Sequence, residues 1–252
     1  MRARTRVGGA ERIAEKLGTA ILRGLYQPSE LLPGEIELSR RFAASRPVVR
    51  EALKLLAGKG FIASRRRTGT CVRPREDWHT LDADVLSWRL KDGKAEPKFA
   101  IDLLHARAVV EPAAAAMAAL RHTPETLRPI EEAFADMQRT AHSAGLFAAP
   151  DIRFHKAILT ATNNDVMMAF AALIEAALGV FVRIASRHAE APAPAVPLHG
   201  AILDAIRRRD AEGAHAAVLA LLDRTSGNVQ RNLRYRLRRK AQQVSHGPDG
   251  RV

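Results

Sequence analysis

The sequence of 252 residues has a single cysteine and contains no long apolar run. Because Cys71 has no possible partner within the chain, a domain held together by disulfides is excluded. No apolar run approaches the roughly 18 residues that a membrane-spanning helix needs. The arginines that follow Met1 are not followed by the apolar segment of a secretion signal. We therefore expect a soluble, cytoplasmic protein without a membrane partner.

The composition is that of a globular protein, but its charge is unevenly distributed. Hydrophobic residues make up 47%, too many for a disordered chain, and the length favours two domains. The net charge of +13 divides into +11 for residues 1–75, −4 for residues 76–229 and +6 for residues 230–252. This pattern favours one domain that binds a polyanion and a second with another role. A merely soluble basic protein is the alternative.

The basic segment has the element order of a winged helix-turn-helix. Apolar residues at helical spacing, with breaks at glycine and proline, predict helices at 11–24, 35–42 and 47–57. Ser45 is placed to cap the third helix, and Pro47 fits its first turn. Two short strands are expected at residues 61–63 and 70–72. The basic tip between these strands is Ser64-Arg65-Arg66-Arg67-Thr68-Gly69.

Arginines near the start of the third predicted helix favour DNA as the polyanion. Arg46 and Arg50 are four residues apart and so lie on one side of that helix. A helix fits the major groove of DNA, where an arginine can bind guanine with two hydrogen bonds, and a basic wing can contact phosphates. A small three-helix domain with a solvated basic surface is the alternative.

Several motifs in this segment resemble the DNA-binding domain of the GntR family of bacterial regulators. They are Leu32-Pro33-Gly34-Glu35, Leu38-Ser39, Ser45-Arg46, Val49-Arg50-Glu51-Ala52-Leu53, Gly60-Phe61-Ile62 and Gly69-Thr70-Cys71-Val72. The resemblance implies that DNA is contacted by Ser45, Arg46, Arg50 and the wing around Gly69, which includes Arg65, Arg66 and Arg67. Many members have arginine directly after the Pro-x-Glu motif, where this chain has Ile36.

After residue 75 the sequence predicts helices only. A connector helix that includes Val85 and Trp88 is expected to pack, with Trp78, onto the second domain; ligand binding by the tryptophans is the alternative. Further helices are predicted at 98–121, 124–144, 151–161, 165–188, 198–209 and 211–239. We therefore predict a mostly α protein with an N-terminal winged helix-turn-helix and a C-terminal all-α helical bundle. The expected boundaries are 1–75 for DNA binding, 76–97 for the connector, 98–229 for effector binding and dimerisation, and 230–252 for a basic tail.

Motifs in the helical part resemble the FCD effector domain of the FadR-like branch of the same family. They are Arg107 with Glu111-Pro112, Asp151-Ile152-Arg153-Phe154-His155, Asn164, His199-Gly200-Ala201-Ile202-Leu203-Asp204 and Arg209-Asp210-Ala211-Glu212. Within that branch the chain is most similar to galactonate-type regulators. The resemblance implies a homodimeric repressor of sugar-acid catabolic genes that binds a pseudo-palindromic operator and is released by an aldonic acid. Another small carboxylate, such as an organic acid or a uronate, is the alternative effector.

Asp151 and His155 are the strongest candidates for site chemistry in the second domain. Four residues apart on a helix, they share one face, and a carboxylate with an imidazole suits a divalent metal such as zinc. His199 lies on a later helix that could pack across them. In the family a further histidine ligand stands where this chain has Leu221. The three residues could hold a metal, hydrogen-bond the effector directly, or form a buried polar cluster with a structural role.

Arg107 is the candidate for an effector carboxylate, because a buried arginine requires an anion. A salt bridge to an acidic neighbour is the alternative. His105, His188 and His215 are expected to be ordinary surface or core histidines.

A metal-dependent hydrolase is a distant possibility, but no nucleophile elbow, separate base or glycine-rich phosphate loop is visible, so we predict that the chain is not an enzyme. A constitutive architectural DNA-binding protein would need no polar cavity.

Overall fold

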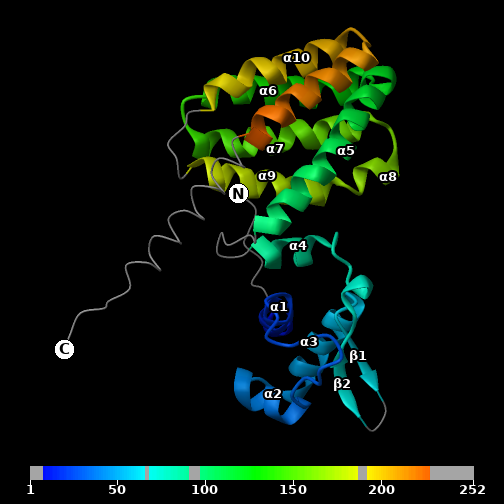
Figure 1. Cartoon of the computed structure of the whole chain (residues 1–252), viewed down its shortest axis with the longest axis vertical. Helices are drawn as coiled ribbons and strands as arrows, with labels where there is room; N and C mark the ends of the chain where they lie inside the picture. The colour runs from blue at the N-terminus through cyan, green and yellow to red at the C-terminus, as the bar shows by residue number, and fades with distance from the viewer. Residues whose placement is uncertain (1–7, 66–67, 91–96, 187–191, 228–252) are drawn as a thin grey trace, which may run out of the picture. The chain divides into compact units, whose positions relative to one another are not determined.

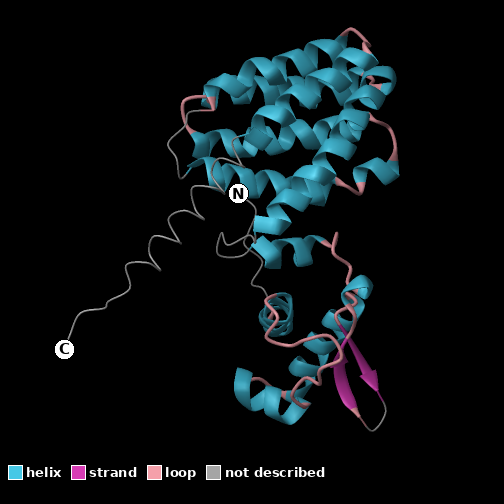
Figure 2. Cartoon of the chain, in the orientation of Figure 1, coloured by secondary structure: helices cyan, strands magenta, loops and turns pink. Residues whose placement is uncertain are grey.

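A computed structural model describes residues 8–65, 68–90, 97–186 and 192–227 (Figure 1). The chain forms two compact units, residues 1–94 and 95–252. The described part is mostly helical, as predicted, and its strands form one small hairpin in the first unit (Figure 2).

The first unit is built around three helices, α1 (Gly9–Leu22), α2 (Glu35–Phe42) and α3 (Arg46–Gly58). One apolar face of each helix is buried in a common core, which includes Leu17, Leu38 and Leu56. The turn between α2 and α3 is made at Ala43, whose φ of 47° is left-handed, and Ser45 then occupies the N-cap position of α3. The predicted helix-turn-helix is therefore confirmed.

The wing is an antiparallel hairpin of β1 (Ile62–Arg65) and β2 (Gly69–Val72). Its inner end is buried at Ile62 and Val72, and its outer end pairs Arg65 with Gly69. Gly69 has a φ of +112°, a conformation that residues with a Cβ atom rarely adopt. The hairpin thus runs from buried residues at its inner end to the exposed Arg65 and Gly69 at its outer end.

The connector packs onto the first unit, so our expectation that its tryptophans pack onto the second domain is wrong. Trp78 and Trp88 both lie beside Phe61, with ring centroids 5.0 and 6.1 Å from it. Trp88 belongs to α4 (Ala83–Leu90) and packs so closely on Gly18 that a Cβ atom there would lie 2.4 Å from the indole ring. The absence of a side chain at Gly18 therefore allows Trp88 to pack directly on α1.

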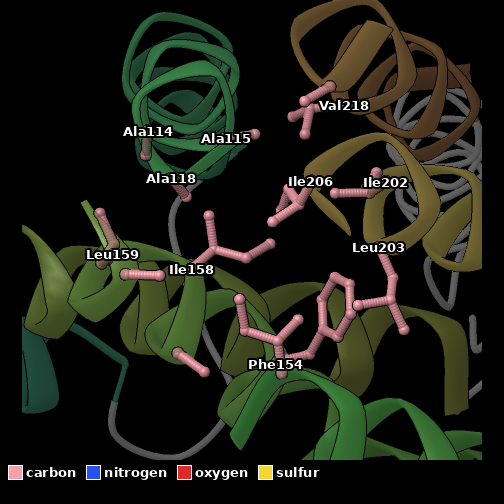
Figure 3. Close-up of a cluster of buried hydrophobic side chains, with 14 of the residues drawn as sticks. Ala114, Ala115, Ala118, Phe154, Ile158, Leu159, Ile202, Leu203, Ile206 and Val218 are labelled. Carbon is pink, nitrogen blue, oxygen red and sulfur yellow. The ribbon is translucent and has the colours of Figure 1, made fainter. Parts of the chain in front are cut away.

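The second unit is a bundle of helices. They are α5 (Pro97–Arg121), α6 (Pro124–Thr140), α7 (Ala144–Ala161), the short α8 (Asp165–Met168), α9 (Ala171–Ser186), α10 (Val196–Arg207) and a last helix whose described part covers 211–227. Helix α7 packs against α5, α6 and α9, and its Phe154 and Ile158 point into the core that α5 and α10 also line (Figure 3).

The largest departures from the predicted helix boundaries lie in α7 and at the junction of α8 and α9. Helix α7 begins at Ala144 and continues through Pro150, because proline removes a single hydrogen bond and the buried face carries on around it. The long helix expected from residue 165 is divided into α8 and α9, and between them the N–H groups of Ala169 and Phe170 make turn-type bonds to the carbonyls of Val166 and Met167. Asn164 caps α8 by accepting from two backbone N–H groups.

The Arg209-Asp210 pair joins α10 to the last helix. Arg209 has a left-handed φ of 58° and donates to the carbonyls of Leu120 and His122, at the carboxyl end of α5. Asp210 then accepts from the N–H of Gly213 at 2.8 Å and starts the next helix. This motif fixes the last helix against the end of α5.

Among the described residues, one helix is long and apolar enough by composition to cross a membrane: Lys98–Arg121, which belongs to α5. Half of its most apolar segment is buried inside the protein. The core helix of a soluble protein passes the same test, and this one carries the buried ion pair of Arg107 and Glu111.

Candidate functional site

The candidate DNA-reading side chains lie exposed at the start of α3. Ser45, Arg46 and Arg50 are all exposed, and the Ser45 side chain makes no capping hydrogen bond. Arg50 donates from Nε and Nη2 to the two carboxylate oxygens of Glu35 on α2, at 3.3 and 3.1 Å. This hydrogen-bonded pair holds the pKa of Glu35 below its ordinary value. The guanidinium of Arg50 is thus held in a defined position before DNA arrives.

The wing supplies the other predicted DNA contacts. Arg65 and Gly69 are exposed and paired with each other at the outer end of the hairpin. Arg66 and Arg67 lie outside the described residues. Ile36, at the position where many family members have arginine, is 53% exposed beside Glu35. The exposed side chain at this position is therefore apolar in this chain.

In the second unit the predicted effector residues are brought together in the interior. Arg107 on α5, Asp151 and His155 on α7, and His199 on α10 are all buried, with at most 7% exposure. The helical spacing of Asp151 and His155 does place both on one face, as predicted. The packing of α10 then adds His199 to them.

The carboxylate of Asp151 lies at the centre of the cluster. Its Oδ1 is 3.0 Å from Nε2 of His199 and 3.7 Å from Nε2 of His155. On the far side of each ring, Nδ1 of His199 is 2.8 Å from the carbonyl oxygen of Ala195, and Nδ1 of His155 is 2.8 Å from Oε2 of Glu111. Since a neutral imidazole that donates through Nδ1 keeps a lone pair on Nε2, both Nε2 atoms are set to accept.

Neither Nε2 atom has a hydrogen-bond partner in the described structure, although both are buried. The separation of His199 Nε2 from Asp151 fits a hydrogen bond, but the direction of the ring nitrogen does not. Buried polar atoms are rarely left unsatisfied, so two such atoms beside one carboxylate indicate a place for a ligand.

The three side chains fit a divalent metal. Asp151, His155 and His199 each offer one ligand atom, and these atoms lie within 4.8 Å of one another. Ligands about 2.0–2.1 Å from a tetrahedral zinc ion are about 3.3–3.4 Å apart, and the two measured Nε2–Oδ1 separations of 3.0 and 3.7 Å lie on either side of that value. Two imidazoles and a carboxylate are also the ligand types that zinc and similar metals accept.

Glu111 is a member of the cluster that our choice of site residues did not include. It is 5% exposed and binds Arg107, whose Nε donates to Oε1 at 2.5 Å. Burial would raise the pKa of Glu111, but the charge of Arg107 and the hydrogen bonds from His155 and Arg107 hold this pKa well below its ordinary value. The salt bridge of Arg107 to an acidic neighbour is therefore present, and the effector contact of Arg107 stays a prediction. The spacing of four residues between Arg107 and Glu111 was the available signal in the sequence.

An aromatic ring packs against both histidines of the cluster. The ring of Phe154 meets those of His155 and His199 edge-on, with centroids 5.7 and 5.3 Å away. Burial would raise the pKa of Asp151, but the adjacent ring of His199, with smaller contributions from His155 and Arg107, keeps this pKa below its ordinary value. A buried, partly apolar site of this kind strengthens every charge interaction inside it.

The other histidines named from the sequence, and Leu221, are not among the candidate metal ligands in the described part of the chain. His105 and His215 are exposed, as expected for surface histidines, and His188 lies outside the described residues. Leu221, at the position of the family's further histidine, is 3% exposed and belongs to the apolar core of the bundle. Within the described residues, the candidate metal ligands are therefore two histidines and one aspartate.

Comparisons with known proteins match both units. The model of the gntR family of bacterial regulatory proteins matches residues 9–72, and that of the FCD domain matches residues 102–224. The galactonate operon transcriptional repressor of Escherichia coli is 35% identical, over 84% of this chain and 93% of the relative. The Uxu operon transcriptional regulator of the same organism is 30% identical, over 80% and 73%.

Solved structures show the same fold. The chain resembles Lar from Listeria monocytogenes with a TM-score of 0.60, at 15% sequence identity, over 92% of this chain and 99% of that one. At this identity the likeness concerns the fold alone.

Proposed function

The chain belongs to the GntR family of bacterial regulatory proteins and carries an FCD domain, and on that premise we propose that it is a transcription repressor released from its operator by a sugar acid. Members of the family are transcription regulators, so the prediction that the chain is not an enzyme is confirmed.

The observation that carries the proposal is the buried cluster of Asp151, His155 and His199, with its two unsatisfied Nε2 atoms. These three residues would hold a divalent metal such as zinc. When bound, the metal supplies a Lewis acid to which a carboxylate and a neighbouring hydroxyl can bind together. Asp151 brings the negative charge, the two histidines each offer a ring nitrogen, and Phe154 helps to exclude water.

A small hydroxy acid suits this site. Relatives named for the galactonate operon and, as a putative regulator, for the L-lactate dehydrogenase operon are 35% and 30% identical to this chain. A galactonate-like aldonate is the first choice, and another organic acid or a uronate is the alternative. The buried groups Arg107, Glu111 and Asp151 carry a net charge of −1, which a divalent metal and a monocarboxylate together neutralise. Direct hydrogen bonding of the effector by the cluster, without a metal, is the second candidate.

Two copies of the chain would bind a pseudo-palindromic operator as a homodimer, each placing α3 in a major groove with support from its wing. The effector acts only if it binds one arrangement of the DNA-binding units better than another. We expect this regulator to work in the cytoplasm, where its operator DNA is.

The test measures operator binding by fluorescence anisotropy while galactonate, a uronate or lactate is added, with and without exhaustive chelation. We expect one of these acids to release the DNA, and chelation to abolish the effect. His155→Ala should prevent release while leaving operator affinity unchanged. Release that survives chelation would favour direct binding of the acid by the cluster, and failure of every small carboxylate to change DNA binding would refute the proposed effector class.

A further inference from the structure

Glu111 stands directly behind one of the proposed metal ligands. Its Oε2 is 2.8 Å from Nδ1 of His155, while the Nε2 atom of the same ring lies 3.7 Å from Asp151. We propose that Glu111 is a positioning residue that fixes the ring of His155 with its proton on Nδ1 and its lone pair toward the metal. This inference rests on the metal site proposed above, and it concerns a residue that does not touch the ion.

The geometry makes Glu111 a support for the ligand and excludes it as a further ligand of the same ion. The two nitrogens of an imidazole point in different directions, so a carboxylate bound to Nδ1 lies on the opposite side of the ring from the ion bound to Nε2. Carboxylates in this position behind a metal-bound histidine orient the ring and raise its basicity.

Arg107 keeps Glu111 in place. Its Nε and Nη2 donate to Oε1 and Oε2 of Glu111 at 2.5 and 3.3 Å, so that the carboxylate is engaged by Arg107 on one side and His155 on the other. The guanidinium is 2% exposed, and a fixed bidentate pair at that depth leaves Glu111 little freedom to rotate. The contacts from Arg107 to Glu111 and from Glu111 to His155 thus connect α5 to the proposed metal ligand on α7.

The other histidine has a different support, which explains why one carboxylate is enough. Nδ1 of His199 lies 2.8 Å from the carbonyl oxygen of Ala195, one turn earlier in the same stretch of chain. A backbone carbonyl cannot be removed by substitution of a side chain. Substitution of Glu111 should therefore affect one ligand of the pair and leave the orientation of the other intact.

The experiment titrates the whole metal-free chain with Co²⁺ and follows both affinity and the visible absorption spectrum, which reports the ligand geometry. We expect Glu111→Leu to weaken Co²⁺ binding by about 10–100-fold. Glu111→Gln should fall between this variant and the natural chain, because its amide oxygen can still accept from Nδ1 but carries no charge. His155→Ala, which removes a ligand, should bind most weakly.

Two further variants separate positioning from a general loss of structure. Glu175→Gln changes an exposed carboxylate paired with Lys156 in the same unit and should leave Co²⁺ affinity unchanged. Arg107→Met should weaken binding through Glu111, so Arg107→Met combined with Glu111→Gln should be no weaker than the more affected single variant. Independent, additive losses would show that Arg107 does not act through Glu111.

The outcomes are distinct for the two levels of the proposal. If the natural chain takes up no Co²⁺ or Zn²⁺, the proposed metal site is wrong and the role of Glu111 falls with it. If the natural chain binds Co²⁺ but folded Glu111→Leu binds it with equal affinity and an unchanged spectrum, only the role of Glu111 is overturned. Should the leucine variant fail to fold, Glu111→Gln decides, since unchanged Co²⁺ affinity in that variant would also refute the inference.

Discussion

At the scale of single residues, the DNA-binding face depends on arginines whose surroundings differ. Arg50 is 64% exposed along its side chain but is already bound to Glu35, whereas Arg46 is exposed at the first turn of α3. An arginine held by a carboxylate keeps other N–H groups directed outward and loses less freedom when it meets a base. Both side chains are therefore candidates for reading sequence.

We predict that Arg46→Ala or Arg50→Ala costs about 1–3 kcal/mol of binding free energy at the operator and relaxes base choice there. Binding to random DNA should change much less. The measurement compares operator and random duplexes by fluorescence anisotropy. Arg128→Ala, which removes an exposed arginine in the other unit, serves as the matched control for net charge.

The wing arginine Arg65 should behave differently. Its side chain is exposed at the end of β1, where contact with phosphates is expected. Arg65→Ala should weaken operator and random DNA alike and reduce the dependence of affinity on salt. If substitutions of Arg46 and Arg65 have the same effect on operator and random duplexes, the assignment of base reading to α3 and phosphate contact to the wing is wrong.

A single residue also distinguishes the proposed metal site from the family's common pattern. Leu221→His would restore an imidazole at the position of the further ligand, and we predict that it raises Co²⁺ affinity. Without metal, the buried polar ring should lower the free energy of unfolding by about 1–3 kcal/mol. Titration with Co²⁺ and urea unfolding test the two effects separately. Unchanged affinity in a folded variant would show that the last helix does not bring residue 221 to the site.

At the scale of elements, α4 is fastened to the end of α3 by one lysine. Lys59, the C-cap residue of α3, donates to Asp82 and Asp84, each at 2.7 Å, and its ammonium lies 5.5 Å from the ring centre of Trp88. Asp82 also accepts from the N–H groups of Asp84 and Val85, so it caps the start of α4. Lys59 therefore connects the start of α4 to the carboxyl end of α3.

We predict that Asp82→Ala lowers the free energy of unfolding of the first unit by about 1–2 kcal/mol, since it removes a helix cap and a partner of Lys59. Both tryptophans of the chain lie in this unit, so tryptophan fluorescence in urea reports its unfolding. Glu51→Ala, which removes an exposed partner of Lys54 on α3, is the control and should have little effect.

The same carboxylate makes this stability depend on pH. Burial would raise the pKa of Asp82, but Lys59 and the backbone N–H groups hold it below the ordinary value. Because the unfolded chain then binds the proton more tightly, Asp82 stabilises the unit fully above its ordinary pKa of about 3.9 and loses this effect as the pH falls toward the lower folded value. The stability difference between the natural chain and Asp82→Asn should therefore shrink below about pH 4. A difference that grew in acid would contradict this assignment.

At the scale of the whole molecule, the charge distribution predicts a role for the basic tail, residues 230–252, which lies outside the described residues. Its net charge of +6 should add non-specific attraction to DNA. Truncation before Gln230 should weaken operator and random duplexes to the same degree and reduce the salt dependence, as measured by titrations at several salt concentrations. Loss of operator preference with the fold intact would overturn this view.

Much of this organisation follows from the sequence because it depends on short-range geometry. The helix-turn-helix, the wing and the shared face of Asp151 and His155 are set by helical period, capping residues and glycine positions, and all of them are present in the structure. Local signals of this kind are complete within a few residues, so one sequence is enough to interpret them.

Only the tertiary structure decided which distant side chains meet. It placed the tryptophans of the connector in the first unit, because both pack against Phe61 and Trp88 also packs on the backbone of Gly18. It also brought Glu111 of α5 behind His155, which lies on another helix. Such contacts depend on how helices far apart in the sequence pack and rotate against each other. Periodicity along one helix says which face is buried, but it does not say which partner that face will find.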